Sequence, residues 1–569
     1  MRLAALFADG YPTAKLQANI SKSQIRLVAP QGANPFVLNL VSAFRQEKKL
    51  SPVHLVITAT GREAEELALA LHELDPNAEV LEFPSWETLP HERLSPSPET
   101  VGKRVRVLQR LHELQESKAE HSVYVLASIR AALQPVVAGL GLHKALNFEV
   151  GKDYLLPELS LKLVELAYER VDMVTRRGEF ATRGGIVDVF PTTAEHAVRL
   201  EFFGDELEEI RLFSVADQRT LTGETATSAG ADEQGRVKAI EIYPARELLI
   251  TPSVANRARQ MLHEFPNIST MLAKLAEGIP VEGMESLAPV LVDQMVPLAS
   301  CLPKDAAAIL IAPEKAAARA ASLVETNEEF LHAAWDAATE GAQAPIDLSA
   351  GGFIDIGQFK ETLEGRQLVT ISQFGADDES LIDLGLLEIP TFVGADGQRE
   401  TSIIDWIRDQ LQHGQRILIS AEGHGTVERI TEMLRAQKVQ AELLEALPGD
   451  HNKAKWPANT VVTIQATLRK GFAAPEANLI VLTDSEFFGR NQAYLNPERR
   501  KLAAKRGQAV DPLNLKSGDY VVHEIHGIGR FKELVTRQTG IGNQKHEREY
   551  LLIEYAPSKR GYPGDTLYV

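Results

Sequence analysis

Short apolar runs alternate with stretches of helical periodicity in the first part of the chain. The runs lie at residues 25–30, 53–60 and 123–128, and a helical segment follows each of them. This alternation is typical of a parallel sheet that carries helices on both faces, because each strand is then buried on both sides. We therefore predict a doubly wound α/β domain over residues 1–150.

The segments after this domain are shorter and richer in turns. Residues 198–214 alternate apolar and polar side chains about Gly204-Asp205, a dipeptide suited to a two-residue hairpin turn. We predict a small α+β insert over residues 151–235. Residues 236–398 then complete the first domain and add one more buried strand.

A second α/β unit and a β-rich end follow. Three apolar runs between residues 416 and 484 predict a small α/β domain over 399–490. Residues 491–513 are basic and predict a linker helix, and residues 514–569 contain four strands with glycine-bearing turns. The last segment is typical of a small β-barrel of the Tudor or SH3 type. The chain is thus predicted to be a multidomain α/β protein.

Composition limits the class of protein. A chain of 569 residues exceeds what one core organises, and 44% hydrophobic with 24% charged residues is typical of globular domains. The single cysteine, Cys301, excludes an internal disulfide and fits a reducing cytoplasm. No apolar run approaches the ~20 residues of a membrane span, and the first ten residues do not fit a signal peptide. We expect a cytoplasmic protein without a membrane partner.

Charge is distributed unevenly. The chain has a formal net charge of −18, yet residues 490–569 carry 14 basic and 9 acidic residues, against 46 and 69 in residues 1–489. An acidic body argues against general nucleic-acid binding, which needs clustered Lys and Arg. The basic run Arg499–Arg506 could contact DNA phosphates, or it could be a solvated helix packed on its neighbours.

The first strand-to-helix turn lacks the residues of a nucleotide site. A phosphate-binding loop would end in Gly-Lys-Ser/Thr, so that backbone N–H groups and the lysine surround the phosphates. Gly32 is present, but Pro35 stands at the lysine position and Phe36 at the hydroxyl position. The later buried strand ends in Ala312-Pro313, where an ATPase needs acids to hold magnesium. We predict that this chain binds no ATP.

Other candidate chemistry is weaker. Asp484 and Glu486 end an apolar strand, but no glycine-lysine loop accompanies them. His523 and His526 lie in a predicted strand and turn rather than on one helix face, which does not suit a metal pair. We therefore predict no metal site and no catalytic residues.

Two groups of motifs resemble known repair proteins. Residues 168–191 and 199–210 resemble the insert domain of the excinuclease protein UvrB and of its relative, the transcription-repair coupling factor. Residues 83–108 and 278–291 are similar to the coupling factor in particular. The resemblance covers nearly the whole chain and implies a helicase-like α/β domain with a degenerate nucleotide site.

The C-terminal motifs resemble a polymerase-binding module. Residues 511–535 and 549–556 are similar to the RNA polymerase-interacting domain of the coupling factor family, which is also similar to the CarD family. That family continues into two motor domains, which use ATP and Mg²⁺ to translocate on DNA, and an autoinhibitory domain. We therefore expect this chain, which stops at Val569, to be a fragment without that motor.

Three functions follow from these resemblances. The first is an adaptor that binds stalled RNA polymerase and recruits the excinuclease protein UvrA. The second is a DNA-unwinding enzyme of the UvrB type, which the residues at Pro35 and Ala312 disfavour. The third is a CarD-type polymerase regulator, for which the long acidic front part has no purpose.

The resemblance also implies contact residues in the insert. Docking on UvrA is implied for Arg170 and Arg183, with Phe180 and Phe190 nearby. A guanidinium can bind a partner carboxylate through two hydrogen bonds. The alternatives are that Arg183 holds local strands together and that Phe190 belongs to the core.

A second set of contacts is implied at the C-terminal end. Docking on the RNA polymerase β subunit is implied for an exposed strand over Arg530–Arg537, since an edge strand offers unpaired backbone groups. The candidates are Phe531, Leu534, Val535 and Arg537, although the family has a hydrophobic residue near the position of Arg537. The alternative is that Phe531 and Leu534 form the barrel core.

Overall fold

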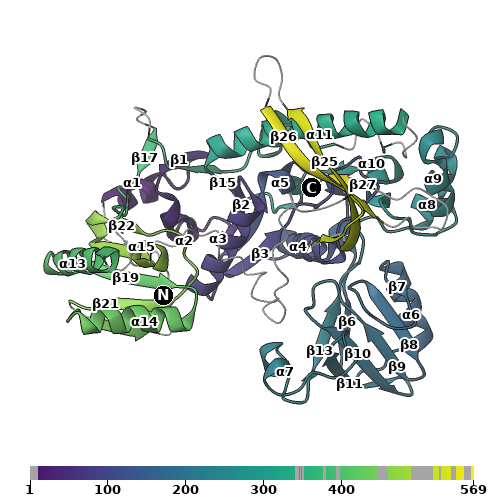
Figure 1. The fold of residues 1–569 in the computed structure, drawn as a ribbon, viewed down its shortest axis with the longest axis horizontal. Coiled ribbons are helices and arrows are strands. Elements are labelled where there is room, and N and C mark those ends of the chain that lie inside the picture. Colours follow the sequence, from purple (N-terminus) through teal and green to yellow (C-terminus); the bar gives the residue numbers. More distant parts are fainter. Residues whose placement is uncertain are drawn as a thin grey trace.

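The computed structural model shows two α/β lobes, an insert domain and a separate antiparallel sheet (Figure 1). It describes residues 11–339, 345–346, 348, 352–375, 378, 380–392, 398–444, 459–488, 517–523, 527–539, 546–555 and 566–568. The predicted basic linker at 491–513, with Arg499–Arg506, lies outside the described residues, as does His526.

The first lobe is built on a parallel sheet of seven strands, as predicted for its class. The adjacent strands β2 and β4 are buried at every position, which explains their mainly apolar sequences. Separate apolar clusters lie on the two faces, so helices cover both sides. In sheet order the strands are β17 (Leu381–Asp383), β1 (Gln24–Val28), β16 (Leu368–Ser372), β15 (Ala307–Ile311), β2 (Val53–Thr58), β4 (Val123–Ser128) and β3 (Glu79–Phe83).

Four helices of the first lobe, α3, α4, α5 and α12, begin at side-chain caps. Thr60 accepts a hydrogen bond from the backbone N–H of Glu63, whose side chain accepts one in return from the N–H of Thr60, and this capping box starts α3. Ser97 caps α4 in the same region, with Pro98 at the first helical position. The helices are α1 (Tyr11–Asn19), α2 (Asn34–Glu47), α3 (Gly61–Leu74), α4 (Pro98–Glu116), α5 (Ile129–Leu133), α11 (Pro313–Thr339) and α12 (Ile356–Thr362).

A histidine lies in the core of this lobe. His54 on β2 is fully buried; its Nε2 lies 2.9 Å from Oγ of Ser42, and its ring stacks on Tyr124 with centroids 5.3 Å apart. Burial is the largest cause that lowers the pKa of His54, to about 3, and the charge of Arg45 acts in the same direction. The imidazole is therefore neutral in the folded protein.

The insert domain is a six-stranded sheet with α6 (Leu156–Glu165) packed on one face. Its predicted hairpin at Gly204-Asp205 is confirmed, because β10 ends at Phe203 and β11 begins at Glu206. Chain entry and exit run side by side, since β6 (Leu146–Glu149) pairs with β13 (Ala239–Ile242). The sheet order is β12 (Arg236–Val237), β11 (Glu206–Phe213), β10 (Ala197–Phe203), β9 (Ile186–Val189), β8 (Glu179–Arg183) and β7 (Glu169–Arg170), with α7 (Glu224–Ser228) at one end.

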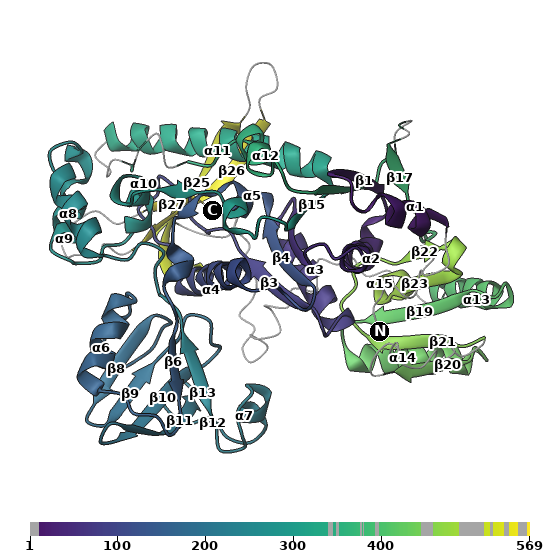
Figure 2. The ribbon, with the colours of Figure 1, turned by 180° about the vertical axis from the view of Figure 1, so that it is seen from behind.

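Buried polar contacts attach the insert to α4. The guanidinium of Arg104 on α4 is fully buried and pairs with Glu247, just beyond the insert, while Trp86 donates to the same carboxylate at 2.9 Å. A Cβ on Gly102 would lie 2.3 Å from Oγ1 of Thr192, so glycine permits the close approach of α4 and the insert. Figure 2 shows the insert beside α4 and away from the second lobe.

Short helices lie between the insert and the end of the first lobe. They are α8 (Pro252–Met261), α9 (Ser269–Ala276) and α10 (Ala288–Leu291), and they share a separate apolar cluster. The following strand β14 (Met295–Val296) pairs with β5 (Val136–Val137), which returns the chain to the first lobe.

The second lobe has a mixed sheet of six strands. The predicted strands β19 (Arg416–Ala421), β21 (Val461–Gln465) and β23 (Leu479–Thr483) are present and parallel. The sheet also takes in β18, which precedes residue 399. Its other elements are β18 (Leu387–Glu388), β20 (Ala441–Leu444), β22 (Phe472–Ala474), α13 (Gln398–Gln412), α14 (His424–Ala436) and α15 (Asp484–Phe488).

The last described strands form an antiparallel sheet. Their order is β24 (Tyr520–His523), β25 (Gly527–Thr539), β26 (His546–Tyr555) and β27 (Thr566–Tyr568). Neighbours in sequence are neighbours in the sheet, which makes it a meander. Closure of this sheet into a barrel stays a prediction.

Candidate functional site

The turn that would hold a nucleotide lies between the two lobes. In open α/β sheets, ligands bind beyond the carboxyl ends of the strands, and the turn after β1 occupies that edge. Phe36, at the start of α2, is fully buried there and meets the fully buried Phe472 of β22 edge to face, with ring centroids 5.0 Å apart. The position due a phosphate-site hydroxyl therefore carries an aromatic contact between the lobes.

A loop of the second lobe closes over the same turn. A Cβ on Gly32 would lie 2.3 Å from the carbonyl oxygen of Lys470, so only glycine fits beneath this backbone. Next to it, Arg469 and Glu66 form an ion pair of 3.1 Å in which both side chains are less than one fifth exposed. Thr467 donates its hydroxyl to Glu73 at 3.1 Å. These contacts hold the loop on α3.

The lobes share one hydrophobic core at this point. One cluster of buried residues joins α2, α3 and the first sheet to the second lobe, where it includes Val462, Phe472 and Val481. Because apolar contact is continuous, separating the lobes would expose this surface to water. The cleft is therefore closed by packing.

The other nucleotide position is also altered. Ala312 has a positive φ of 47°, which is unusual for a residue with a side chain, and its N–H donates to the carbonyl oxygen of Ile371 at 2.8 Å. Pro313 follows as the first residue of α11. Together with Pro35 and Phe36, these residues supply no ammonium, hydroxyl or carboxylate to the cleft.

The acids at the end of β23 have a structural contact. Glu486 accepts hydrogen bonds from the N–H groups of Gly471, at 3.0 Å, and Thr483, at 2.7 Å. This carboxylate therefore holds the end of β23 to the loop that closes the cleft. The sequence offered Asp484 and Glu486 no glycine-lysine loop to work with, and Glu486 fixes the backbone.

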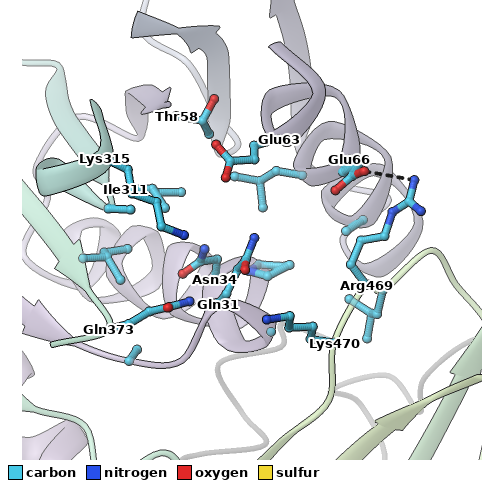
Figure 3. A pocket seen from close by; sticks show the side chains of 18 of the residues that line it. Gln31, Asn34, Thr58, Glu63, Glu66, Ile311, Lys315, Gln373, Arg469 and Lys470 are labelled. Carbon is cyan, nitrogen blue, oxygen red and sulfur yellow. Dashed lines mark ion pairs between the residues drawn. The ribbon is translucent and has the colours of Figure 1, made fainter. Parts of the chain in front are cut away.

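A cavity of about 70 Å³ remains beside the closed turn (Figure 3). The side chains of Gln31, Asn34 and Gln373 line it, together with the two lysines Lys315 and Lys470. Sequence reasoning missed these carboxamides, because isolated Asn and Gln residues in turns carry no recognisable spacing.

Two arginines of the insert lie at one end of its sheet. Arg170 and Arg183 are exposed. The guanidinium of Arg170 donates to Oγ1 of Thr182 at 2.9 Å, and that of Arg183 donates to the carbonyl oxygen of Asp172. Thr182 directly precedes Arg183, and Asp172 lies two residues after Arg170. The two hydrogen bonds therefore hold the segments that carry the arginines next to each other. The structure brings this pair together and leaves it accessible.

The two phenylalanines proposed beside them lie elsewhere. Phe180 is fully buried in the main core of the insert, on the face shared with Val187 and Val189. Phe190 is 7% exposed and lies beneath Arg177, whose Cζ is 5.1 Å from the ring centroid. The expectation that these rings contact a partner is corrected: they support the sheet.

Three exposed apolar side chains of the insert are further candidates for a contact surface. Met173 is 50% exposed and Phe203 is 76% exposed, while Ile186 is exposed opposite Arg183 in the β8–β9 pair. Strand alternation could have placed Ile186 on this face, because Val187 is apolar as well and only one of the two can point inward. We call Arg170, Met173, Arg183, Ile186 and Phe203 the insert surface.

The C-terminal candidates separate into core and edge. Phe531 is 4% exposed, and its backbone bonds to Gly518 and Asp519, so the proposed contact of Phe531 with a partner is corrected to a core position. β24 covers β25 only as far as Arg530, and Val535 lies further along, partly buried. The side chains of Leu534 and Arg537 lie outside the described ones.

Metal-binding clusters and membrane-spanning helices are both absent from the described residues. No group of three or more His, Cys, Asp or Glu among them is placed to hold a metal ion. Over the same residues, the helices lack the length and apolar content needed to cross a membrane.

The fold defines a class: a multidomain α/β protein with a parallel-sheet lobe fused to a mixed-sheet lobe, an inserted domain and a small antiparallel sheet. Two family models match parts of it, the UvrB interaction domain over residues 146–248 and the CarD-like/TRCF RID domain over residues 515–569. Both matches coincide with regions that the sequence motifs had indicated.

Curated relatives match nearly the whole chain. It is 40% identical over 587 aligned residues to the transcription-repair-coupling factors of Mycobacterium bovis and Mycobacterium tuberculosis, covering 99% of this chain and 45% of each relative. The Bacillus subtilis transcription-repair-coupling factor is 27% identical over 533 residues, covering 90% of this chain and 42% of the relative. The chain is therefore homologous to part of the transcription-repair-coupling factors, and it spans less than half the length of these relatives.

A solved helicase structure gives no further support. The Hef helicase domain of Pyrococcus furiosus has a TM-score of 0.13 and 11% identity, over 82% of this chain and 87% of that one. A similarity this low carries no argument about the fold.

Proposed function

We propose that this chain is an adaptor of transcription-coupled DNA repair, which binds RNA polymerase at one end and recruits UvrA at the other. The observation that carries the proposal is the presence, in one chain, of a UvrB interaction domain and a CarD-like/TRCF RID domain. Homology to transcription-repair-coupling factors over 99% of the chain supports it. The closed cleft supports an adaptor over a nucleotide-driven enzyme.

The insert surface is proposed as the contact for UvrA. It combines two accessible guanidinium groups with exposed Met173, Ile186 and Phe203. Arginine and aromatic side chains are enriched among the residues that dominate binding energy, and apolar neighbours exclude water around them. The hydrogen bonds of Arg170 and Arg183 to Thr182 and Asp172 restrict these side chains before binding.

Co-purification with UvrA tests this surface. Arg170→Ala combined with Arg183→Ala should reduce capture of UvrA at least about tenfold, since truncating a desolvated charge-pair partner costs about 2–5 kcal/mol. The matched control is Arg236→Ala, an exposed arginine of β12 at the opposite edge of the same sheet. Stability of both proteins should stay within about 1 kcal/mol of the parent chain. Undiminished capture by the double variant would move the contact to another face.

The uncovered part of β25 is proposed as the contact for the RNA polymerase β subunit. Beyond Phe531 the strand pairs with β26 on one side, while β24 ends opposite Arg530. The N–H and C=O groups on its other side pair with none of the described residues and could bind a strand of the partner. The proposed run is thus shorter than the one the sequence indicated, and begins at Lys532.

A charge placed on this edge tests the contact. Val535→Glu should abolish binding of the polymerase β subunit while circular dichroism remains unchanged, because an unpaired carboxylate would be desolvated at the interface. Tyr520→Glu is the matched control, since Tyr520 lies on β24 and is 80% exposed. Equal loss of binding in both variants, or unfolding of Val535→Glu, would contradict the edge-strand contact.

We also propose that this part of the protein uses no nucleotide. The family resemblance implies that ATP, Mg²⁺ and most DNA contacts belong to motor domains rather than to residues 1–569. Pro35, Phe36 and Ala312 stand where a nucleotide site would need charged or hydroxyl groups.

A further inference from the structure

The cavity beside the closed turn has the position and polarity of a binding site. It lies at the carboxyl ends of the first lobe's strands, where Thr58 ends β2 and Ile311 ends β15. Two helices begin at its wall, α2 with 14 residues and α11 with 27 residues. The N-terminus of a helix carries partial positive charge, which favours an anion. This field is what the two helices contribute, because the N–H of Asn34 already donates to the carbonyl oxygen of Gln31, and Pro35 and Pro313 have no N–H.

The second observation concerns side chains rather than helix ends. Asn34 is only 8% exposed and lines the cavity, and among the described residues its carboxamide has no hydrogen-bond partner. Its carboxamide therefore faces the cavity, where a ligand can accept its N–H groups. Gln31 and Gln373 also line the cavity without a side-chain partner in the described part of the chain. Three unused carboxamides thus surround one space.

Charge in the cavity is positive once existing pairs are considered. Glu63 accepts the N–H of Thr60 in the α3 capping box, and Glu66 pairs with Arg469. Lys315 and Lys470 form no ion pair with any described residue. In Figure 3 the ammonium of Lys315 and the carboxamides of Asn34 and Gln31 point toward the middle of the cavity. Glu63 keeps its negative charge in its bond to Thr60, so the lining, with three basic and two acidic residues, has a formal charge of +1.

We infer that this cavity binds a small tetrahedral oxyanion, a phosphate ion or the phosphate group of a small phosphomonoester. One water requires roughly 10–15 Å³ of such volume, so the cavity of about 70 Å³ holds about five non-hydrogen atoms, the number in phosphate. Lys315 and Lys470 supply charge, and Asn34, Gln31 and Gln373 donate amide N–H groups. The contact of Gly32 with the Lys470 carbonyl leaves no room for a triphosphate.

Titration of the full chain with inorganic phosphate tests the site. At constant ionic strength, phosphate should raise the melting temperature with a saturable dependence, and calorimetry should give the same midpoint. Lys315→Gln should weaken binding about tenfold or more, since one charge-assisted hydrogen bond is lost. Lys304→Gln is the matched control, because exposed Lys304 precedes the same strand β15 at its other end. It should bind phosphate like the parent chain.

Competition experiments distinguish a free phosphate ion from the phosphate group of a phosphomonoester. Glycerol 3-phosphate competing with phosphate would indicate a phosphomonoester, and failure to compete would indicate the free ion; either result supports the site. A linear, non-saturating response would overturn the inference, as would equal weakening by Lys304→Gln and Lys315→Gln. Tighter binding of ATP than of phosphate would also overturn the inference, because a triphosphate fits only if the cleft between the lobes opens. The inference does not depend on the proposed adaptor function.

Discussion

Phe36→Ala removes the aromatic side chain that joins the two lobes. The ring is fully buried and meets Phe472 at 5.0 Å, inside a core that both lobes share. Truncating a buried phenylalanine to alanine costs about 3–5 kcal/mol, of which about 0.5–1.5 kcal/mol comes from an edge-to-face partner. We expect the free energy of unfolding of the two-lobe unit to fall by about 3–5 kcal/mol.

Urea unfolding followed by circular dichroism measures this loss. Because the lobes share a core, we expect them to unfold in one transition in the parent chain. With a slope near 3 kcal/mol/M, the loss lowers the urea midpoint by about 1–2 M. The control is Phe213→Ala, which truncates another fully buried ring, in a separate cluster of the insert. It should affect the transition of the insert and leave that of the lobes in place.

Two results would refute the shared core. One is a midpoint shift of less than about 0.3 M in Phe36→Ala, which corresponds to about 1 kcal/mol. The other is separate unfolding of the two lobes in the parent chain. Either result would mean that the apolar contact between the lobes is too weak to couple them.

Three further outcomes follow from individual positions. Pro35→Lys with Phe36→Thr restores the side chains of a nucleotide loop, yet calorimetry should detect no ATP binding because the second lobe covers the site; saturable binding would contradict this. Burial holds the pKa of His54 at about 3 against an ordinary 6.5, so the unfolded chain binds more protons. Stability is therefore full above about pH 6.5 and falls below it, by about 2 kcal/mol at pH 5, and His54→Gln should remove this component from pH-dependent unfolding curves. Glu247→Ala leaves Arg104 buried without its carboxylate and should cost about 3–5 kcal/mol in thermal unfolding; a loss below about 1 kcal/mol would contradict the pairing.

Local features of the fold could be predicted from the sequence, and contacts between distant segments could not. β2 and β4 were predictable because strands buried on both faces carry mainly apolar residues. The hairpin at Gly204-Asp205 was predictable from turn chemistry. The contact of Phe36 with Phe472 depends on how two sheets pack, which no periodicity records.

The candidate sites show the same division. Family motifs indicated Arg170 and Arg183, and both are exposed. The same motifs could not show that Phe180 faces the core, since alternation along β8 defines two faces without telling which one is covered. Asn34 was missed because its significance comes from burial without a partner among the described residues, a property of the folded chain.

The paired strands β6 and β13 make the insert an exchangeable module. Its two ends lie side by side in register, from Leu146 opposite Ile242 to Glu149 opposite Ala239. The chain of the first lobe therefore enters and leaves the insert through two adjacent strands, as it would a short hairpin. Because the entropic cost of closing a loop grows slowly with its length, the size of the insert adds little to the cost of folding the lobe. Its partner-binding face can thus diverge, or be transplanted together with this stem, without changing the order of strands in the lobe that carries it.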